Sequence, residues 1–255
     1  MLMNPKIVTK VDFDDLDFEK FRTLAQNDTL SRHEKVGFPD DYREGKEHAI
    51  FCDMVSKMRS LERANLVALE IGPGCSKMPL MLADLCLQQN GAVHFVDSEE
   101  MLKHIPDSAH IYKWSGRFPN TPNLLKKMTN KVDCIIAYSV IQYVFSGGNL
   151  WEFVDCCLEL LKEGGELFLG DIPNSSMRKR FFSSNEGLKT HQGFSGQKRG
   201  LNVEFNILEN GRIDDAVLFG ILARARASGF HSWVLPQGKH LPFQNRREDV
   251  LIRRP

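Results

Sequence analysis

The sequence predicts an α/β fold with a doubly wound, mainly parallel sheet, and three observations lead to this prediction. Short apolar runs that suit strands buried on both faces alternate with stretches whose apolar residues recur at helical spacing. A turn with two glycines, in "LEIGPG" (69–74), directly follows the first of these runs. The length of 255 residues and the hydrophobic content of 42% suit one well-filled domain with an appendage, or at most two small domains.

Seven strands are expected, with helices between them. Apolar residues on one face of 41–61 predict a helix before the first strand. The expected strands are 66–71, 92–97, 110–114, 131–140, 166–172, 231–237 and 248–255. Further helices are expected over 77–87 and 98–105, over 150–163 with Gly164 and Gly165 closing it, and over a stretch headed by Asp214 and Asp215 and capped by Gly229. The last two strands lie close together in the sequence, which indicates an antiparallel C-terminal hairpin at the sheet edge.

Two parts of the chain are expected to differ in role. Residues 1–61 are predicted to form an N-terminal helical cap, and residues 62–255 the domain that contains the sheet. Within the second part, 175–212 is an expected insertion or lid, because polar and basic residues with little periodicity fill the stretch between Pro173 and Arg212. Loops of that length are usually functional or disordered.

The charge balance argues against partners that attract proteins through a long-range field. Thirty-three basic and thirty-three acidic residues cancel, so no overall field draws the protein to nucleic acid or to an anionic membrane. The first residues contain no apolar run long enough for a signal peptide, and no stretch approaches the roughly 20 apolar residues of a membrane-spanning helix. A cytoplasmic protein is expected, with neither nucleic acid nor membrane as a partner.

The six cysteines show no metal-binding pattern. They include no CxxC pair and have no histidine at ligand spacing, so no metal is expected. The adjacent Cys156 and Cys157 fall in an expected helix, where core packing is the favoured interpretation and redox activity the alternative.

The turn after the first strand can bring a ligand close to the backbone, because glycines there leave N–H groups at the start of the next helix facing it. A dinucleotide-binding GxGxxG fingerprint would need a third glycine at position 77, where the chain has Lys77. A Walker loop, GxxxxGK followed by Ser or Thr, is absent as well. These departures argue against NAD, FAD and a phosphate cradle.

Two acidic residues accompany the turn. Glu70 lies two residues before the first glycine, where a negative charge would repel a pyrophosphate and attract a positive amino group. Asp97 closes the second expected strand, where a carboxylate can accept hydrogen bonds from both ribose hydroxyls. S-adenosylmethionine has an ammonium group, a ribose and no phosphate, and the two acids favour it as the ligand. The alternatives are a solvated strand end for Glu70 and a helix N-cap for Asp97.

At this point the chain resembles the class I S-adenosylmethionine-dependent methyltransferases. The resemblance covers about 65–255 and rests on "LEIGPG" and "HFVDSEEML", two motifs at the family's interval and in its strand order. It implies a Rossmann-like methyltransferase fold for 62–255, S-adenosyl-L-methionine as cofactor and S-adenosyl-L-homocysteine as product. The chain departs from the family at Ser76, in the third small position of GxGxG, and after the third strand, where "WSGR" (114–117) has no acid.

The resemblance also assigns residues to parts of the cofactor. It places the methionine end at Glu70 and at the loop of Gly72, Pro73 and Gly74, the ribose at Asp97, and the adenine near Ser98 and Met101. Family members commonly cover the cofactor with an N-terminal segment, so Tyr42 and Arg43 are candidates to contact the methionine end or the substrate. Exposed helix positions are the alternative for these two.

The reaction centre is expected after the fourth strand, where "AYSVIQYV" (137–144) matches the family's segment under the transferred methyl. Its candidate residues are Tyr138, Ser139, Gln142 and Tyr143. Gln142 stands where many small-molecule members have a histidine, and a glutamine can orient a substrate but cannot accept a proton. Asp171 is then the favoured general base, with a cap or turn role as its alternative. Asn174 and His191 are further candidates.

The expected function is transfer of a methyl group from S-adenosylmethionine to a small molecule, with a hydroxyl of an anionic metabolite or carbohydrate as the favoured acceptor. An anionic substrate would suit the basic residues of the expected lid, which are Arg178, Lys179, Arg180, Lys189, Lys198 and Arg199; a solvated face is the alternative. An N-methyltransferase for an amine or a protein side chain is the other enzymatic reading, which an acidic pocket would favour. A non-catalytic regulatory protein that binds S-adenosylmethionine also stays open, and so does the oligomeric state.

Overall fold

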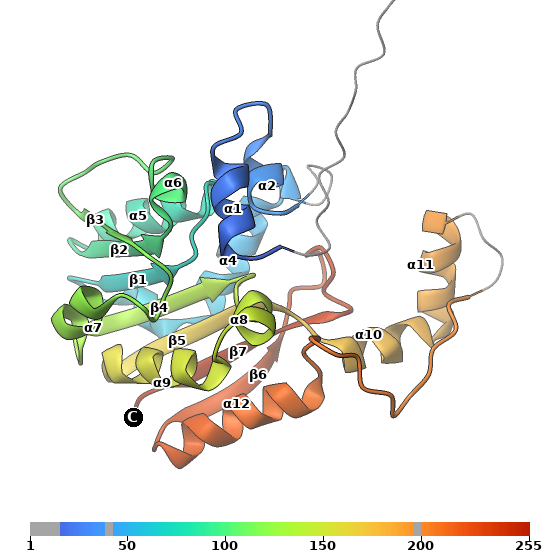
Figure 1. The fold of residues 1–255 in the computed structure, drawn as a ribbon. Coiled ribbons are helices and arrows are strands. Elements are labelled where there is room, and N and C mark those ends of the chain that lie inside the picture. The colour runs from blue at the N-terminus through green and yellow to red at the C-terminus, as the bar shows by residue number, and fades with distance from the viewer. Residues whose placement is uncertain (1–15, 39–42, 196–199) are drawn as a thin grey trace, which may run out of the picture.

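A single seven-stranded sheet forms the centre of the computed structural model, which describes residues 16–38, 43–195 and 200–255 (Figure 1). The strand order is β3-β2-β1-β4-β5-β7-β6. The strands are β1 (Val67–Ile71), β2 (Ala92–Asp97), β3 (Ile111–Ser115), β4 (Val132–Tyr138), β5 (Leu161–Pro173), β6 (His231–Pro236) and β7 (Arg247–Arg253). The first five strands pair in parallel, and β7 pairs antiparallel with both β5 and β6. The predicted fold class, including the C-terminal hairpin, is confirmed.

The direction of winding reverses between β1 and β4. The chain builds outward from β1 to β2 and β3, then returns to place β4 on the other side of β1. In open α/β sheets, ligands bind outside the carboxyl ends of the strands at such a switch point. Glu70 and Tyr138 lie at the ends of these two neighbouring strands, so the topology places the expected site here.

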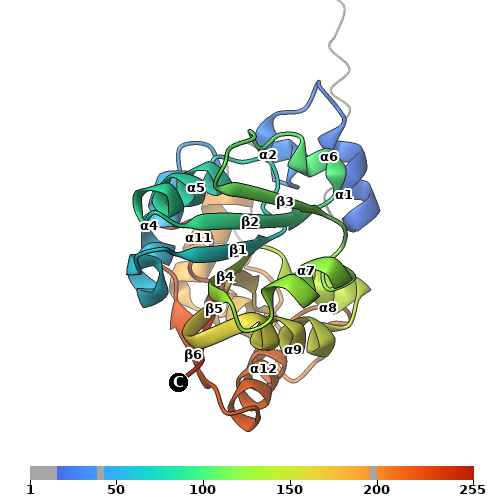
Figure 2. The same cartoon turned by 90° about the vertical axis from the view of Figure 1, so that its left-hand side faces the viewer.

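Helices cover both faces of the sheet (Figures 1 and 2). One core contains side chains of α4 (Glu47–Lys57), the 3₁₀-helix η1 (Arg59–Glu62), α5 (Met78–Gln88) and α6 (Glu99–Leu102). The opposite core contains side chains of α7 (Pro122–Met128), α8 (Ile141–Gly147), α9 (Leu150–Leu160) and α12 (Asp215–Ala227). Alternate residues of β4 serve the two cores, with Ile135 on one side and Ile136 on the other. The continuous apolar runs of the sequence therefore follow from burial on both faces.

Two N-terminal helices, α1 (Phe18–Ala25) and α2 (Arg32–Lys35), lie near α6 at the edge where the parallel strands end (Figure 1). Arg22 on α1 donates to both carboxylate oxygens of Glu100 on α6, at 2.8 and 3.0 Å. The Nε2 atom of His104 lies 3.0 Å from the carbonyl oxygen of Ala25. These contacts hold the two helices over the edge where the parallel strands end, as expected of a cap. The predicted division at residue 61 stays a prediction.

Two predicted helix boundaries are wrong. The helix expected over 150–163 ends at Leu160, because Leu161 already pairs with Val132 as the first residue of β5. Gly164, with φ of +66°, lies inside β5 where the pairing with β4 shifts register, so it permits an irregularity in a strand rather than closing a helix. The helix expected over 41–61 is also shorter, because Met58 is extended and separates α4 from η1.

The stretch expected to be a loop contains two helices, α10 (Ser175–Phe182) and α11 (Asn185–Ser195). Asn174 starts α10, since its side chain accepts hydrogen bonds from the N–H groups of Ser176 and Met177 at 2.9 and 3.2 Å. Figure 1 shows α11 standing away from the body of the molecule, beyond α10. A lid role for 175–212 stays a prediction. Within the described ranges, no helix has the length and apolar character needed to cross a membrane.

The interior strand β5, which pairs with β4 and β7, should carry much of the stability. Phe168 is fully buried in it, so Phe168→Ala should lower the free energy of unfolding by about 3–5 kcal/mol, because the cavity left behind refills only in part. Urea unfolding measures this difference. Phe219→Ala on α12 is the control, since that ring is 61% exposed, and it should change the value by less than about 0.5 kcal/mol. Equal losses in the two variants would contradict the assignment of Phe168 to the core.

Candidate functional site

The turn after β1 requires glycine at two positions. Gly72 and Gly74 have φ of +67° and +63°, a region that favours glycine. A Cβ at Gly72 would lie 2.7 Å from a methyl group of Val140, and one at Gly74 would lie 2.5 Å from a methyl group of Val36. The turn is therefore enclosed by the start of α8 on one side and by the end of α2 on the other.

Two carboxylates flank this turn, as predicted from their places at the ends of β1 and β2. The Oδ2 atom of Asp97 accepts a hydrogen bond from the N–H of Gly74 at 3.2 Å, and its Oδ1 atom accepts one from the N–H of Ser98 at 2.7 Å. Glu70 is 4% exposed, and its buried Oε2 atom has no hydrogen-bond partner among the described residues. An acceptor atom left in this state is costly unless a donor from a ligand or water reaches it.

Burial changes the protonation of both acids. Burial first, and then the nearby charge of Asp97, raises the pKa of Glu70 to about 8. Burial also raises the pKa of Asp97 to about 6, although the two N–H donors act against it. At neutral pH the pair therefore holds a proton that a cation placed beside Glu70 would displace.

A cavity of about 470 Å³ opens over the turn. Most of the predicted cofactor residues line it, namely Arg43, Glu70, Gly72, Pro73, Gly74, Asp97, Met101 and Tyr138, together with the predicted catalytic residue Tyr143. Ser98 is not in its lining; its hydroxyl accepts from the N–H of Met101 and caps α6. Tyr42 lies outside the described residues, and so do Lys198 and Arg199.

The cap helices close part of this cavity. The ring of Phe21 on α1 meets the ring of Tyr143 on α8 edge to face, with centres 5.0 Å apart. Leu16, His33 and Phe38 also line the cavity from the N-terminal segment. The N-terminal segment and the ends of β1, β2 and β4 thus share one cavity.

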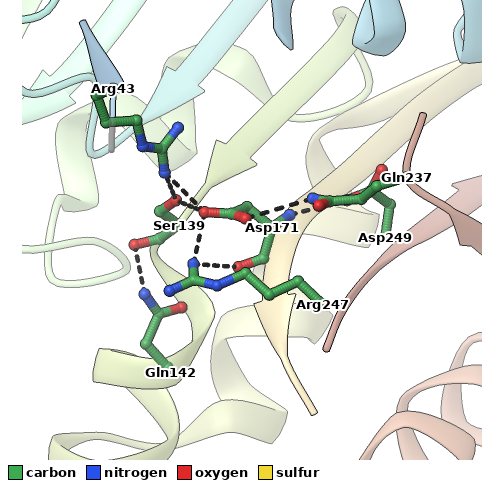
Figure 3. Close-up of polar contacts among 7 residues, drawn as sticks. All are labelled: Arg43, Ser139, Gln142, Asp171, Gln237, Arg247 and Asp249. Atoms are coloured by element: carbon green, nitrogen blue, oxygen red, sulfur yellow. Dashed lines mark hydrogen bonds and ion pairs between the residues drawn. The ribbon is translucent and has the colours of Figure 1, made fainter. Parts of the chain in front are cut away.

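Asp171 lies in a buried ionic cluster next to the cavity (Figure 3). Its Oδ2 atom accepts from Arg43 at 2.7 Å, from Arg247 at 2.6 Å and from the hydroxyl of Ser139. Its Oδ1 atom accepts from Gln237 at 3.3 Å. Both Ser139 and Asp171 have positive φ, +58° and +59°, at the carboxyl ends of neighbouring strands.

This geometry argues against Asp171 as a general base. Burial alone would raise the pKa of Asp171, but Arg247, Arg43 and the hydrogen bonds from Ser139 and Gln237 outweigh it and hold the pKa below its usual value. Asp171 is 3% exposed, and it is not part of the cavity lining. A carboxylate that holds its charge and already has four partners is a poor proton acceptor.

The other sequence candidates for the reaction centre are dispersed. Gln142 donates from Nε2 to the carbonyl oxygen of Ser139 at 2.8 Å and does not line the cavity. His191 lies on α11 with its ring 6.5 Å from that of Phe182, away from the cavity lining. Asn174 donates to Asp215 at 2.7 Å while capping α10.

The basic residues expected in the lid are partly engaged elsewhere. Lys179 donates to the carbonyl oxygen of Ile207 at 2.6 Å, and Arg180 pairs with Asp215 at 2.5 Å. Of the three arginines and lysines at 178–180, Arg178 is the one whose guanidinium lies over a ring, that of Phe182 at 5.6 Å.

Three residues at or beside the site were not predicted from the sequence. Glu47 on α4 lines the cavity and accepts from the N–H of Lys77 at 2.9 Å, at the start of α5. His33 on α2 lines the cavity too, and its buried Nδ1 atom has no hydrogen-bond partner in the described part of the chain. Arg247 reaches Asp171 from β7. Only the capping box of Ser31 and Glu34 around α2 left a local signal.

Comparisons with solved structures show the same architecture in methyltransferases. An S-adenosylmethionine-dependent methyltransferase from Aquifex aeolicus superposes with a TM-score of 0.50 at 12% identity, over 94% of this chain and 98% of its own. The CurJ carbon methyltransferase gives 0.55 at 16% identity, over 92% and 67%. The plantazolicin methyltransferase BpumL gives 0.54 at 12% identity, over 93% and 96%. The chain has the class I methyltransferase fold. At sequence identities this low, the similarity concerns the fold alone.

Sequence comparison reaches less of the chain. No protein-family model matches it. Chondramide synthase cmdD of Chondromyces crocatus is 31% identical over 106 residues, which are 41% of this methyltransferase-like chain. The chain spans about 3% of the length of that curated relative.

The buried acid at the turn should make stability depend on pH. Between pH 4.5 and 8 the folded protein keeps the proton of Glu70 that the unfolded chain releases, so stability should fall as pH rises through this window. Glu70→Gln removes this dependence. The free energy of unfolding of the variant should therefore rise relative to that of the wild type by up to about 1.4 kcal/mol per pH unit. Urea unfolding at pH 5 and pH 8 measures the difference. Glu163→Gln, at an exposed position, is the control and should follow the wild type at both pH values. A stability difference from the wild type that grows with pH in that variant as well would contradict the assignment.

Proposed function

We propose that this chain is an S-adenosylmethionine-dependent methyltransferase that acts on a small molecule, at a hydroxyl of an anionic metabolite or carbohydrate. The observation that carries the proposal is the buried Oε2 atom of Glu70, which has no hydrogen-bond partner among the described residues. It lies beside a turn that requires glycine at positions 72 and 74. An ammonium group would satisfy that atom, and S-adenosylmethionine has one. The proposal keeps the cytoplasmic location expected from the sequence.

The residues present fit this cofactor. Gly72 and Gly74 leave open the space that a Cβ would fill, so the backbone can approach a ligand closely. Asp97 has the position to accept from ribose hydroxyls, and its two N–H donors hold the carboxylate in place. Met101 and Phe118 offer apolar surface in the cavity, where the adenine would lie. BpumL, one of the proteins of similar fold, was solved with S-adenosylhomocysteine.

The adenine end departs from the family at Arg117. This residue lines the cavity, and its Nη2 atom donates to the carbonyl oxygen of Gly147 at 2.5 Å, which ties the segment after β3 to the end of α8. The segment also pairs with β2, since the N–H of Gly116 donates to the carbonyl oxygen of Asp97 at 2.9 Å. Apolar side chains and backbone, rather than an acid, would then hold the adenine.

The bound cofactor would supply a methyl group on a positively charged sulfur, and the protein's contribution is to align a nucleophile with it and exclude water. Phe21 and Tyr143 enclose the cavity between the cap and α8. Burial raises the pKa of the Tyr143 hydroxyl, so this group would orient an acceptor rather than take its proton.

His33 is the candidate for taking that proton. Among the described residues that line the cavity, His33 is the only histidine. Its buried Nδ1 atom has no hydrogen-bond partner in the described part of the chain. A neutral imidazole within reach of a hydroxyl can accept the proton as the new bond forms. This role replaces the one expected for Asp171.

The carboxylates of the cavity give little support to an amine acceptor. Glu47 is engaged with the N–H of Lys77, Asp17 caps α1, and Glu19 pairs with Arg22. Glu70 and Asp97 are at the cofactor turn. These carboxylates are therefore engaged by other groups of the protein or assigned to cofactor binding. None is left to bind an amine acceptor, and this favours the hydroxyl acceptor. A non-catalytic protein would bind the cofactor without turnover.

The cofactor assignment predicts a specific loss on mutation. S-adenosylhomocysteine at a hundred times its dissociation constant should stabilise the wild type by ~2.7 kcal/mol, and Asp97→Ala should weaken binding at least about tenfold because the ribose loses its acceptor. Calorimetric titration with S-adenosylmethionine and S-adenosylhomocysteine measures this loss. Asp107→Ala, whose side chain is 96% exposed, should bind like the wild type. A well-folded wild type that binds neither compound would overturn the proposed function.

The role of His33 predicts a split between rate and affinity. His33→Gln should lower kcat about a hundredfold, within the range of general-base effects, and leave the affinity for S-adenosylhomocysteine unchanged. The measurement follows transfer of a tritium-labelled methyl group from S-adenosylmethionine to acceptors in a metabolite extract. His231→Gln, exposed on β6, is the control. An unchanged rate in His33→Gln would rule out this role, and absence of turnover in the wild type with cofactor bound would favour the regulatory alternative.

A further inference from the structure

A row of guanidinium groups and phenyl rings begins at the cavity and continues along the carboxyl edge of the sheet. The guanidinium of Arg43 lies 4.2 Å from the ring centre of Phe38, and both residues line the cavity. Arg247 lies 5.7 Å from Phe38 and 5.2 Å from Phe243. Arg246 continues the row at 4.4 Å from Phe243. The rings fix the planes of the guanidinium groups, so their edges point in set directions.

Most N–H donors of the two inner arginines have no acceptor among the described residues. Arg43 donates through Nη2 only, to Ser139 and Asp171, and Arg247 donates through Nη1 only, to Asp171. A guanidinium carries five N–H donors. The side chains are 10% and 16% exposed, so these donors are largely shielded from bulk water. Shielded donors without acceptors are costly, and a ligand with several acceptor oxygens would satisfy them.

The two inner arginines share a single carboxylate oxygen. Arg43 and Arg247 both bond to the same Oδ2 atom of Asp171, at 2.7 and 2.6 Å. One negative charge therefore serves two guanidinium groups that lie side by side. The neighbouring carboxylates of Asp249 and Asp53 share Lys57, at 2.7 and 2.5 Å, and neither of them bonds to the two arginines in the described part of the chain. An oxyanion between the two arginines would relieve their mutual repulsion.

The backbone at this place is held in an unusual conformation. Phe243 has φ of +63°, which is rare for a bulky residue. Ser139, which accepts from Arg43, and Asp171, which accepts from Arg43 and Arg247, have positive φ as well. Such conformations persist where the surrounding structure imposes them, and they gather at binding sites. Here the strained Phe243 is the residue whose ring lies between Arg246 and Arg247.

We propose that Arg43, Arg247, Phe38 and Phe243 form a subsite that binds an oxyanion of the methyl acceptor, a carboxylate or a phosphate. The subsite rests on the proposed function, since it begins where the cavity leaves the glycine turn and would hold the acceptor beside the cofactor. Asp171 is then a positioning residue, which keeps the two guanidinium groups together without touching the acceptor.

The test uses three probes of similar size, benzoate, phenyl phosphate and the neutral benzyl alcohol, titrated into the protein with and without S-adenosylhomocysteine. At least one anion should bind about tenfold or more tightly than benzyl alcohol, and the tighter of the two identifies the group that the subsite prefers. Arg247→Gln should abolish this preference and leave the affinity for S-adenosylhomocysteine unchanged, because Arg247 does not line the cavity. Arg43 is left intact because it does.

Two further variants keep the result interpretable. Phe243→Gly removes the ring while relieving the positive φ, so it should fold and still lose the preference for anions. Arg224→Gln is the matched control, since that guanidinium also lies over a ring, that of Trp151 at 5.7 Å, on the far helices α9 and α12.

The outcomes separate the two proposals. A wild type that binds S-adenosylhomocysteine but shows no preference for either anion overturns the subsite and leaves the proposed function standing. Loss of the preference in Arg224→Gln as well would also overturn it, as a general effect of charge. Anion binding that Arg247→Gln abolishes, in a protein that does not bind S-adenosylhomocysteine, would support the subsite and overturn the proposed function.

Discussion

The buried carboxylate of Asp171 connects the parts of the molecule that make the site. It bonds to Arg43 from the N-terminal segment, to Ser139 from the end of β4 and to Arg247 from β7. A buried ion pair with one partner removed leaves a charge without compensation, which is strongly unfavourable. The N-terminal segment, β4 and the C-terminal hairpin are therefore held in one arrangement by a single side chain. The shape of the cavity between them depends on that arrangement.

The sheet could be predicted from the sequence because each strand is an apolar run with its own local signal. The position of helix α9 could be predicted from the sequence, but its last residue could not. Gly164 and Gly165 are equally suited to a helix end and to an irregular strand. Only the pairing of Leu161 with Val132, which is a tertiary contact, decides between them. The helices α10 and α11 were missed for a similar reason. Their sequence is polar and has little periodicity, so their ends are set by caps such as Asn174 rather than by an apolar face.

The proposed cofactor end of the cavity could be located from the sequence because its groups lie next to strands in the sequence. Glu70, Gly72 and Asp97 are all fixed by the ends of β1 and β2, so their spacing carries the information. Asp171 could be placed near the site but not understood, because its partners Arg247 and Arg43 lie 76 and 128 residues away. A carboxylate alone predicts a base, and the same carboxylate between two arginines does not. Arg247 gave no local signal, and for His33 the capping box of Ser31 and Glu34 indicates a helix but not a position at the cavity.

The cap helices α1 and α2 share little apolar surface with the rest of the molecule. Their cluster contains the buried residues Ala25, Cys75 and Met101, with Phe21 and Val36 against it, whereas the two cores of the sheet are far larger. The ion pair between Arg22 and Glu100 lies at the surface, where water and salt screen it, so it adds little. Opening of this unit therefore costs much less than global unfolding. Amide hydrogens of α1 and α2 would exchange with solvent long before those of β1 and β4, and a ligand that fills the cavity beneath them would slow that exchange first.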